Sequence, residues 1–254
     1  MSANDPVPGG HRHGAQAPAL PAPTPLRALL VGSAVAYTRP GSRSGIAKRP
    51  VAGPLFAGRD GLQGDEQGDL RVHGGPDKAL HHYPFDHYPA WRAELPGRAV
   101  LEAPGAFGEN LSTLGWTEQT VCIGDVVQAG GAVLEVSQGR QPCWKLNDRF
   151  GQADMARRLQ ASGRTGWYYR VREPGRLRAG DMMRIVARPF PDWPLGRLLE
   201  MLYRRMLDRE LLEQAAALPL PESWTRLIHN RLRTARVEAW DKRLEGPARG
   251  QPAP

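Results

Sequence analysis

One cysteine of this chain stands among cations. In residues 136–147 (VSQGRQPCWKLN), Cys143 follows Pro142 directly and lies between Arg140 and Lys145. Positive neighbours stabilise a thiolate relative to a thiol, which lowers the pKa of the cysteine and produces a soft anionic sulfur suited to attack or to metal ligation. The alternative is a half-buried cysteine that packs as a small apolar side chain, since free cysteines are among the most buried residue types.

A predicted β-strand and turn position this thiol. Residues 131–136 (GAVLEV) are typical of a strand, and Gly139 and Pro142 predict a turn where that strand ends. A second candidate, His73, lies in the loop-rich residues 60–80, where many glycines let the backbone approach a ligand closely. The two glycines that follow His73 leave its imidazole exposed, so we expect both side chains to be available to a ligand.

The other histidines do not form a recognisable metal site. Four histidines lie between residues 73 and 87, but no pair has the i, i+4 spacing of a helical zinc site and no CxxC accompanies them. Residues 81–91 predict an aromatic-rich helix, because Tyr83, Tyr88 and Trp91 recur at helical spacing. Such a stripe is typical of a core.

Two further loops carry groups that could bind a ligand. Asn110 lies in the glycine-punctuated residues 104–113, and its amide could hydrogen-bond the edge of a heterocycle. The alternative is a tight turn in which Asn110 bonds its own backbone. Arg164 stands between small residues in a glycine turn, and its guanidinium matches phosphate oxygens. Cys122 is flanked by β-branched residues and is expected to be a core thiol.

Composition limits the class of protein. The 254 residues allow one large domain or two smaller ones, and 41% hydrophobic residues suffice for a core. The formal charge of +8 is spread along the chain and favours anionic ligands without requiring nucleic acid. Two cysteines in different contexts argue against a disulfide framework and fit a reducing cytoplasm. No signal peptide is recognised, and no apolar run approaches the roughly 20 residues of a membrane span.

Changes of composition divide the chain. Residues 1–25 predict a disordered lead-in, residues 26–188 a β-rich domain, residues 189–246 a helical domain and residues 247–254 a tail. Three prolines between residues 189 and 194 mark the boundary. Within the β-rich domain we expect one short helix over residues 148–160 and a final hairpin over residues 175–186.

Apolar spacing beyond the boundary predicts three helices. Arginines on the last of them could imitate a helix-turn-helix reader of DNA, but they could equally form a solvated basic face. Two prolines between the second and third helices favour the solvated face. The arginines concerned are Arg226, Arg231, Arg233 and Arg236.

Several spaced motifs, taken in order, resemble the MOSC family, which is named for the carboxy-terminal domain of molybdenum cofactor sulfurase. The motifs are GLQGD (61–65), RVHGGPDKA (71–79), FGENL (107–111), IGD (123–125), QGRQPC (138–143) and SGR (162–164) leading to Gly166 and Trp167. The resemblance covers about residues 26–244 and is closest to the YiiM-type branch. It implies a β-rich α+β fold, with a MOSC-type β-barrel domain followed by a small three-helix region.

The resemblance also implies a cofactor and a reaction. Family members hold a molybdopterin-type molybdenum cofactor and reduce N-hydroxylated compounds, including base analogues such as 6-hydroxylaminopurine. Cys143 matches the expected molybdenum ligand, and pyridoxal phosphate is not expected. We expect Asn110 to meet the cofactor, and His73 to orient a bound group or pass a proton. The cations expected to face the cofactor phosphate are Arg71, Lys78, Arg140 and Arg164.

Reducing equivalents are expected to come from another protein. If Cys143 binds metal, only Cys122 remains, which cannot build a four-cysteine iron–sulfur cluster. No flavin or nicotinamide glycine fingerprint appears either. We therefore expect a separate flavin or iron–sulfur donor that docks on the basic surface, and a small N-hydroxylated substrate. A membrane partner is not expected, and a homodimer is left open.

Two alternatives of a different class stay open. The protein could carry the molybdenum cofactor or a persulfide sulfur without turning over a substrate. It could also be a basic nucleic-acid-binding protein, whose affinity would fall steeply with salt as phosphate counterions are released.

Overall fold

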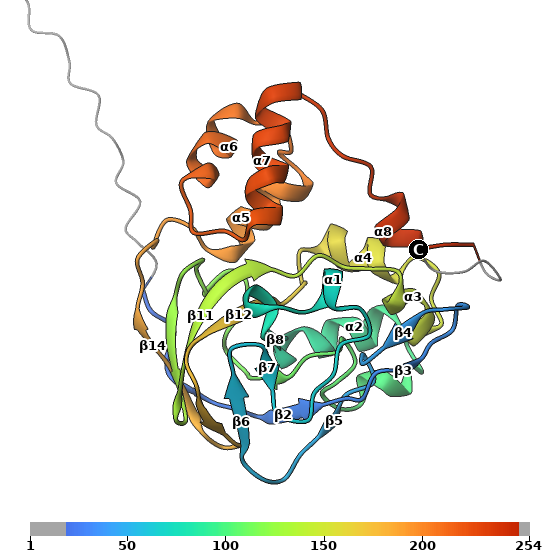
Figure 1. The fold of residues 1–254 in the computed structure, drawn as a ribbon, viewed down its shortest axis with the longest axis vertical. Helices are drawn as coiled ribbons and strands as arrows, with labels where there is room; N and C mark the ends of the chain where they lie inside the picture. Colours follow the sequence, from blue (N-terminus) through green and yellow to red (C-terminus); the bar gives the residue numbers. More distant parts are fainter. Residues whose placement is uncertain (1–18, 249–254) are drawn as a thin grey trace, which may run out of the picture.

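In the computed structural model, which describes residues 19–248, one mixed nine-stranded sheet curls into a half-barrel, and helices cover one end of it (Figure 1). The strand order is β1-β14-β10-β11-β12-β8-β9-β2-β5. Neighbouring strands are antiparallel except β8 and β9, which pair parallel. The strands are β1 (Thr24–Pro25), β2 (Ala28–Val31), β5 (Arg49–Pro50), β8 (Leu80–His82), β9 (Leu111–Ser112), β10 (Val126–Ala129), β11 (Ala132–Gly139), β12 (Trp167–Glu173) and β14 (Met182–Ala187).

Two small sheets and several short helices complete the β-rich part. One sheet joins β13 (Gly175–Leu177), β6 (Leu55–Gly58) and β7 (Gly61–Leu62), and the other joins β3 (Val35–Ala36) and β4 (Arg43–Ser44). The helices are α1 (Leu70–His73), η1 (Pro76–Lys78), η2 (Phe85–His87), α2 (Tyr88–Glu94), η3 (Ala99–Leu101), α3 (Lys145–Phe150) and α4 (Met155–Ser162). None of the helices in the described part of the chain is long and apolar enough to span a bilayer.

Strand β11 is the element that leads to Cys143. Its first residues alternate between buried and half-buried positions, as expected for a strand with one face in the core, and its last four are all buried. The Ser137 hydroxyl donates to the Asp77 carbonyl at 2.7 Å, which ties the end of β11 to η1. β12 pairs along most of β11, with register shifts. The prediction of a strand that ends just before the cysteine is confirmed.

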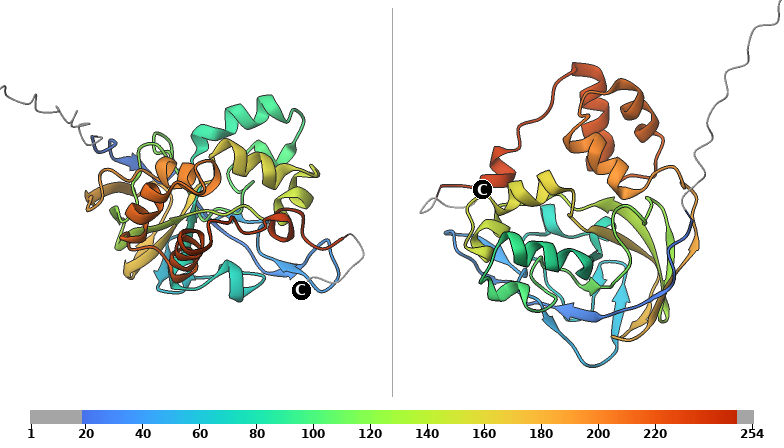
Figure 2. Two further views of the ribbon diagram at one scale, coloured as in Figure 1. Left: turned by 90° about the horizontal axis from the view of Figure 1, so that it is seen from above. Right: turned by 180° about the vertical axis from the view of Figure 1, so that it is seen from behind.

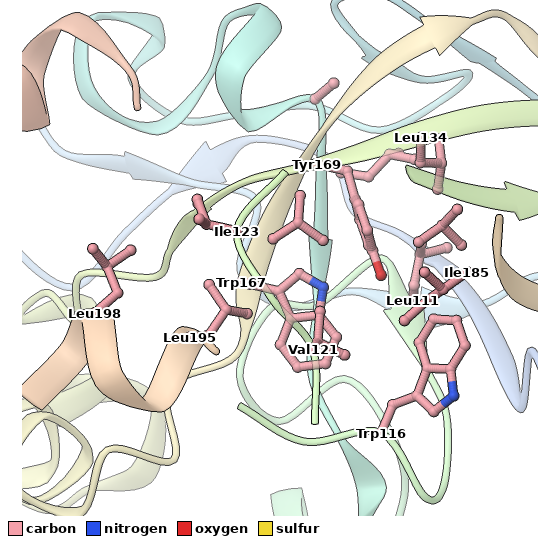
Figure 3. Packing of buried hydrophobic residues seen from close by; sticks show 14 of the residues in the cluster. Leu111, Trp116, Val121, Ile123, Leu134, Trp167, Tyr169, Ile185, Leu195 and Leu198 are labelled. Atoms are coloured by element: carbon pink, nitrogen blue, oxygen red, sulfur yellow. The ribbon is translucent and has the colours of Figure 1, made fainter. Parts of the chain in front are cut away.

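Three helices follow the half-barrel and share its core. They are α5 (Leu195–Tyr203), α6 (Arg209–Ala216) and α7 (Glu222–Thr234), as the apolar spacing predicted. Figure 3 shows Leu195 and Leu198 of α5 near Ile123 and Trp167 of the half-barrel, and all four belong to one buried cluster. Near residue 189 the chain therefore changes from strands to helices, but the hydrophobic core continues across this point.

The last helix leaves this bundle. After α7, residues 236–240 run back toward the half-barrel, and α8 (Asp241–Glu245) packs beside α3 and α4 (Figures 1 and 2). Sequence periodicity did not separate this helix from the preceding three.

Three expectations about secondary structure were wrong. Residues 81–91 are not one helix, because β8 extends through His82 to pair with β12, and Pro84 disfavours a helical residue before it. Residues 148–160 form parts of two helices, because Gly151 takes a left-handed conformation at φ 59°. Residues 175–186 do not form a hairpin, since β13 pairs with β6 and β14 pairs with β10 and β1.

The chain termini are more ordered than expected where the structure describes them. Thr24 and Pro25 form β1, although we expected the lead-in to extend to residue 25. The rest of that prediction concerns mainly residues 1–18, which lie outside the described residues, as do residues 249–254 of the predicted tail.

The basic face predicted on the last helix of the bundle is also incomplete. Arg231 is 1% exposed and is paired with Glu238 at 2.8 Å. Arg226 pairs with Glu222 on the same helix. A buried arginine cannot meet a phosphate backbone, so Arg231 is not available for such a contact.

Candidate active site around Cys143

The turn that carries the thiol, here called the cysteine turn (residues 140–144), is held at both ends. The Arg140 N–H donates to the Gly166 carbonyl at 2.9 Å, which anchors the turn to the start of β12. The Leu146 N–H donates to the Cys143 carbonyl at 3.0 Å, where α3 begins. Cys143 itself is half-buried and lines a cavity.

His73 lies beside this thiol. Its Nε2 is 3.5 Å from Sγ of Cys143, within hydrogen-bond range for sulfur. Burial raises the pKa of Cys143, but the hydrogen bond and charge of His73, the charge of Arg140 and the backbone N–H of Lys145 together lower it to about 6. A pKa near 6 favours the thiolate at neutral pH, and the largest lowering comes from His73. Of the two cations next to Cys143 in sequence, Arg140 contributes its charge, whereas Lys145 contributes its backbone N–H.

The cavity encloses about 560 Å³ of space, part of which is open to solvent. It brings together five of the residues that the sequence singled out, and adds others from the β3–β4 region and from β8 and β12. The predicted residues in its lining are His73, Lys78, Asn110, Arg140 and Cys143, and the additional polar or aromatic residues include Lys48, Asp65, Glu66, His81, Phe107, Lys145 and Tyr168.

Two of the cavity lysines are already engaged with the fold. Lys48 is ion-paired with Asp65, and both side chains are buried. Lys145 Nζ donates to the Arg43 carbonyl at 2.6 Å. Burial lowers the pKa of Lys78, against the opposing charges of Asp77 and Cys143. Of these three lysines, Lys48 has its charge balanced by a carboxylate of the lining, and Lys145 uses one donor on the backbone.

Arg140 differs from these lysines. It is 5% exposed, and its Nη1 has no hydrogen-bond partner among the described residues. His73 Nδ1 and His81 Nε2 also lack partners among residues 19–248. Buried polar atoms are nearly always hydrogen-bonded, so three partnerless atoms on the lining of one cavity indicate where a ligand would bind.

His81 was missed as a site residue because its sequence context suggested a core helix. Burial, followed by the charge of Arg140, holds the pKa of His81 well below its ordinary value, so its imidazole is neutral. The ring lies 4.9 Å from that of Tyr168, which comes from β12. The pairing of β8 with β12 could not be inferred from either segment alone.

The side-chain amide of Asn110 joins three parts of the fold. Its Oδ1 accepts from the His81 backbone N–H at 3.0 Å, while its Nδ2 donates to the Leu30 carbonyl at 3.1 Å and to Asp65 Oδ2 at 2.9 Å. These contacts use the amide to join β2, β8 and the Asp65 loop. Asn110 therefore builds the cavity wall and does not form a turn bonded to its own backbone. Because it lines the cavity, its contact with the cofactor stays a prediction.

Arg164 is not brought to the cavity. Its Nη2 is 2.6 Å from Glu94 Oε1, and its guanidinium stacks 3.8 Å above the Trp91 ring. Gly163, left-handed at φ 71°, ends α4 just before it and directs the chain toward α2. Arg164 is therefore not among the residues that line the cavity of Cys143, and a phosphate anchor at Arg164 stays a prediction. Arg71 lies on α1 two residues before His73, but its side chain is outside the description.

Two glycines, Gly68 and Gly45, let segments of the protein's own backbone approach each other closely. A Cβ on Gly68 would lie 2.1 Å from the Arg43 carbonyl oxygen, and one on Gly45 would lie 2.1 Å from that of Glu66. These glycines allow two loops of the chain to pack closely, which forms one wall of the cavity. These two glycines therefore make room for another segment of the chain and not for a ligand.

The lining of this cavity suits a metal that arrives as part of a cofactor better than a bare metal ion. Among residues 19–248, no three His, Cys, Asp or Glu side chains are grouped as a bare metal ion would require. A metal bound here would have to bring most of its own ligands, which a dithiolene cofactor does. One thiolate and one buried guanidinium with a partnerless N–H fit a soft metal attached to an anionic group.

Comparisons with known proteins agree with this arrangement. Residues 69–184 match the model of the MOSC domain, and residues 193–235 match that of the YiiM-like, 3-alpha helix domain. The chain is 40% identical to Protein YiiM of Escherichia coli over 219 residues, which cover 86% of this chain and 97% of that protein. The crystal structure of Escherichia coli YiiM is similar with a TM-score of 0.75 at 33% identity, covering 89% of this chain and 100% of that one.

A fungal protein is also similar. A protein of Gibberella moniliformis named Reductase is 37% identical over 220 residues. The match covers 84% of this chain but 39% of the fungal protein, so most of that longer protein has no counterpart here.

Proposed function

The chain belongs to the MOSC domain family and carries the YiiM-like three-helix domain, and from this premise we propose that it is a molybdenum-cofactor-dependent reductase of N-hydroxylated compounds. The observation that carries the proposal is the Cys143 thiolate, 3.5 Å from His73, on a cavity that also has an arginine N–H, of Arg140, with no partner among residues 19–248. The family in general binds molybdenum cofactor, and one relative is named a reductase.

Cys143 and Arg140 are the residues we assign to the cofactor. The Cys143 sulfur would serve as a protein ligand to molybdenum, because a lowered pKa keeps it anionic. Arg140 Nη1 would donate to the anionic part of the pterin. When bound, the cofactor supplies the redox chemistry by which an N–O bond is cleaved.

We assign to His73 the transfer of a proton to the bound substrate. Reducing an N-hydroxyl group to an amine consumes two electrons and two protons and releases water. With Nε2 directed at Cys143, Nδ1 of His73 is the ring atom left to exchange a proton with a bound group. His81, neutral and also partnerless at Nε2, would accept a hydrogen bond from a ligand N–H or O–H. A base analogue such as 6-hydroxylaminopurine carries such donors.

Electrons would come from a separate flavin or iron–sulfur protein in the cytoplasm. Both cysteines are free, in keeping with a reducing compartment. Cys122 is buried, and its Sγ donates to the Pro191 carbonyl at 3.6 Å, so it is a core thiol. Burial, with Asp125 next, raises the pKa of Cys122 to about 11, which suits no redox role.

The test is to make the protein in a host that synthesises the cofactor, measure bound molybdenum, and assay reduction of 6-hydroxylaminopurine with a reduced artificial donor. We expect stoichiometric molybdenum and turnover, both lost in Cys143→Ser and kept in Cys122→Ser. If the protein binds molybdenum but turns over no N-hydroxylated compound, it would be a carrier of the cofactor and not a reductase. Full activity in Cys143→Ser would refute the assignment of the metal ligand.

A further inference from the structure

The short helix α8 lies beyond both family matches and contacts the cysteine turn directly (Figure 1). The Trp144 N–H donates to the Arg243 carbonyl at 2.8 Å. The Arg243 guanidinium donates to the Pro142 carbonyl through Nη1 and to Gln160 Oε1, at 2.7 Å, through Nη2. One residue of α8 thus holds the backbone on both sides of Cys143.

Packing supports these hydrogen bonds. Leu244 is buried, and its carbonyl accepts from Asn147 Nδ2 at 2.8 Å, which fixes α8 to α3. Gly246 lies against the Trp144 indole so closely that a Cβ there would be 2.5 Å from Cγ. The guanidinium of Arg39 lies 4.3 Å from the centroid of the same indole. Trp144, the residue after Cys143, is therefore enclosed by two segments that are distant in sequence, through the backbone of Gly246 and the side chain of Arg39.

The segment that leads to α8 is anchored in the three-helix region. Arg231, buried on α7, binds Glu238 through Nε at 3.0 Å and Nη2 at 2.8 Å. Glu238 in turn accepts from Trp240 Nε1 at 2.8 Å, and the Trp240 ring meets that of Tyr203 edge-on at 5.7 Å. A continuous set of contacts thus runs from α5 and α7 to the cysteine turn.

We propose that α8 is a positioning element for Cys143, with Arg243 as its positioning residue. By holding the Pro142 carbonyl and the Trp144 N–H, α8 keeps the sulfur within reach of His73 Nε2 and the Lys145 N–H. The inference rests on the proposed function only in taking Cys143 as the reactive group. The three-helix region also contributes to the site, because its contacts with Glu238 and Trp240 hold the segment that leads to α8.

The test measures the thiol itself, without cofactor or substrate. Full-length protein with Cys122→Ser would be alkylated with iodoacetamide across a pH series, and the midpoint of the rate would report the Cys143 pKa. The parent should show a midpoint near 6. In Arg243→Leu we expect a rise of about one pH unit or more toward the roughly 8.5 of a free cysteine. Arg243→Lys, which can still reach one of the two oxygens, should restore part of the shift.

Two variants separate positioning from general loosening. Gly246→Ala keeps every hydrogen-bonding group of α8 but displaces it from Trp144, so its midpoint should also rise. The control Arg157→Ala removes the ion pairs of α8 with α4, which involve side chains 47% to 71% exposed, and should leave the midpoint unchanged. Circular dichroism would establish that the variants are folded.

An unchanged midpoint in folded Arg243→Leu and Gly246→Ala would overturn the inference, and so would an equal rise in Arg157→Ala. Because alkylation requires neither molybdenum nor turnover, a raised midpoint in the first two variants would uphold the positioning role even if the reductase assay failed. Conversely, an active reductase with unchanged midpoints would uphold the proposed function and remove only the role of α8.

Discussion

Cys143 Sγ and His73 Nε2 lie 3.5 Å apart although 70 positions separate the two residues in sequence. The cysteine is delivered by the end of β11 and the histidine by α1, and the Ser137–Asp77 hydrogen bond joins the two regions nearby. A cysteine and a histidine within hydrogen-bond range are also found as the nucleophile and base of some enzymes. Here the lowered pKa of the thiol suits metal ligation equally well.

Replacing His73 should protonate the thiol. In His73→Leu the hydrogen bond and charge that lower the Cys143 pKa are lost while burial, which raises it, remains. At pH 7 the thiolate fraction should fall from about nine tenths to a few per cent or less. Alkylation rates at pH 7 should drop by at least about tenfold, with His73→Gln intermediate. A rate equal to the parent would show that His73 does not set the thiol pKa.

The same thiolate should make stability depend on pH. The pKa of Cys143 is about 6 in the folded protein and roughly 8.5 when unfolded, so between these values the unfolded chain binds more protons. Stability from this group is therefore complete above about pH 8.5 and is lost as the pH falls through 6. The difference in unfolding free energy between the parent and Cys143→Ser should rise by on the order of 2 kcal/mol from pH 6 to pH 8.5, measured by urea unfolding. A flat difference would contradict the folded thiolate.

Asn110 should matter for stability more than for ligand contact. Asn110→Ala removes the side-chain partner of the buried His81 N–H and of the Leu30 carbonyl, and one of several hydrogen bonds to the Asp65 carboxylate. It should cost about 2–4 kcal/mol of unfolding free energy. Asn230→Ala is the control, because Asn230 is exposed and its side-chain oxygen accepts from Arg233 on the same helix. This variant should cost less than about 0.5 kcal/mol. Urea unfolding of both variants would decide, and equal costs would contradict the structural role of Asn110.

Replacing Arg140 and replacing Arg164 should have different effects on the amount of cofactor that the protein retains. Arg140→Leu removes the partnerless guanidinium N–H from the cavity, so molybdenum bound after purification should fall severalfold. Arg164→Leu removes a surface ion pair and the stacking on Trp91, and should cost about 1 kcal/mol of stability without changing molybdenum content. The reverse pattern of molybdenum contents would restore Arg164 as an anchor.

Much of the site followed from local patterns. Strand alternation ending at a glycine and a proline located the Cys143 turn. The glycines after His73 singled out that residue, although its imidazole is half-buried and not exposed as expected. Apolar spacing located α5, α6 and α7. These features depend on neighbours a few residues apart, so a single sequence carries them.

Pairing across the fold was not predictable in the same way. Lys48 meets Asp65, and Arg164 meets Glu94, through contacts that depend on which loops lie together. Strand β8 replaced a predicted helix because β12 lies beside it, and this pairing brought His81 into the cavity. Whether a charged or polar atom is free to bind a ligand depends on such partners.

By itself, the sequence determined that this protein presents a cysteine among cations at the end of a strand, with a helical region after it. Only the tertiary structure decided that His73 is the partner of that cysteine, that Arg140 keeps a partnerless N–H, and that α8 returns to hold the cysteine turn. The reason is physical: the ionisation of a thiol and the availability of a donor depend on distances of a few ångströms, and folding sets these distances between segments that are remote along the chain.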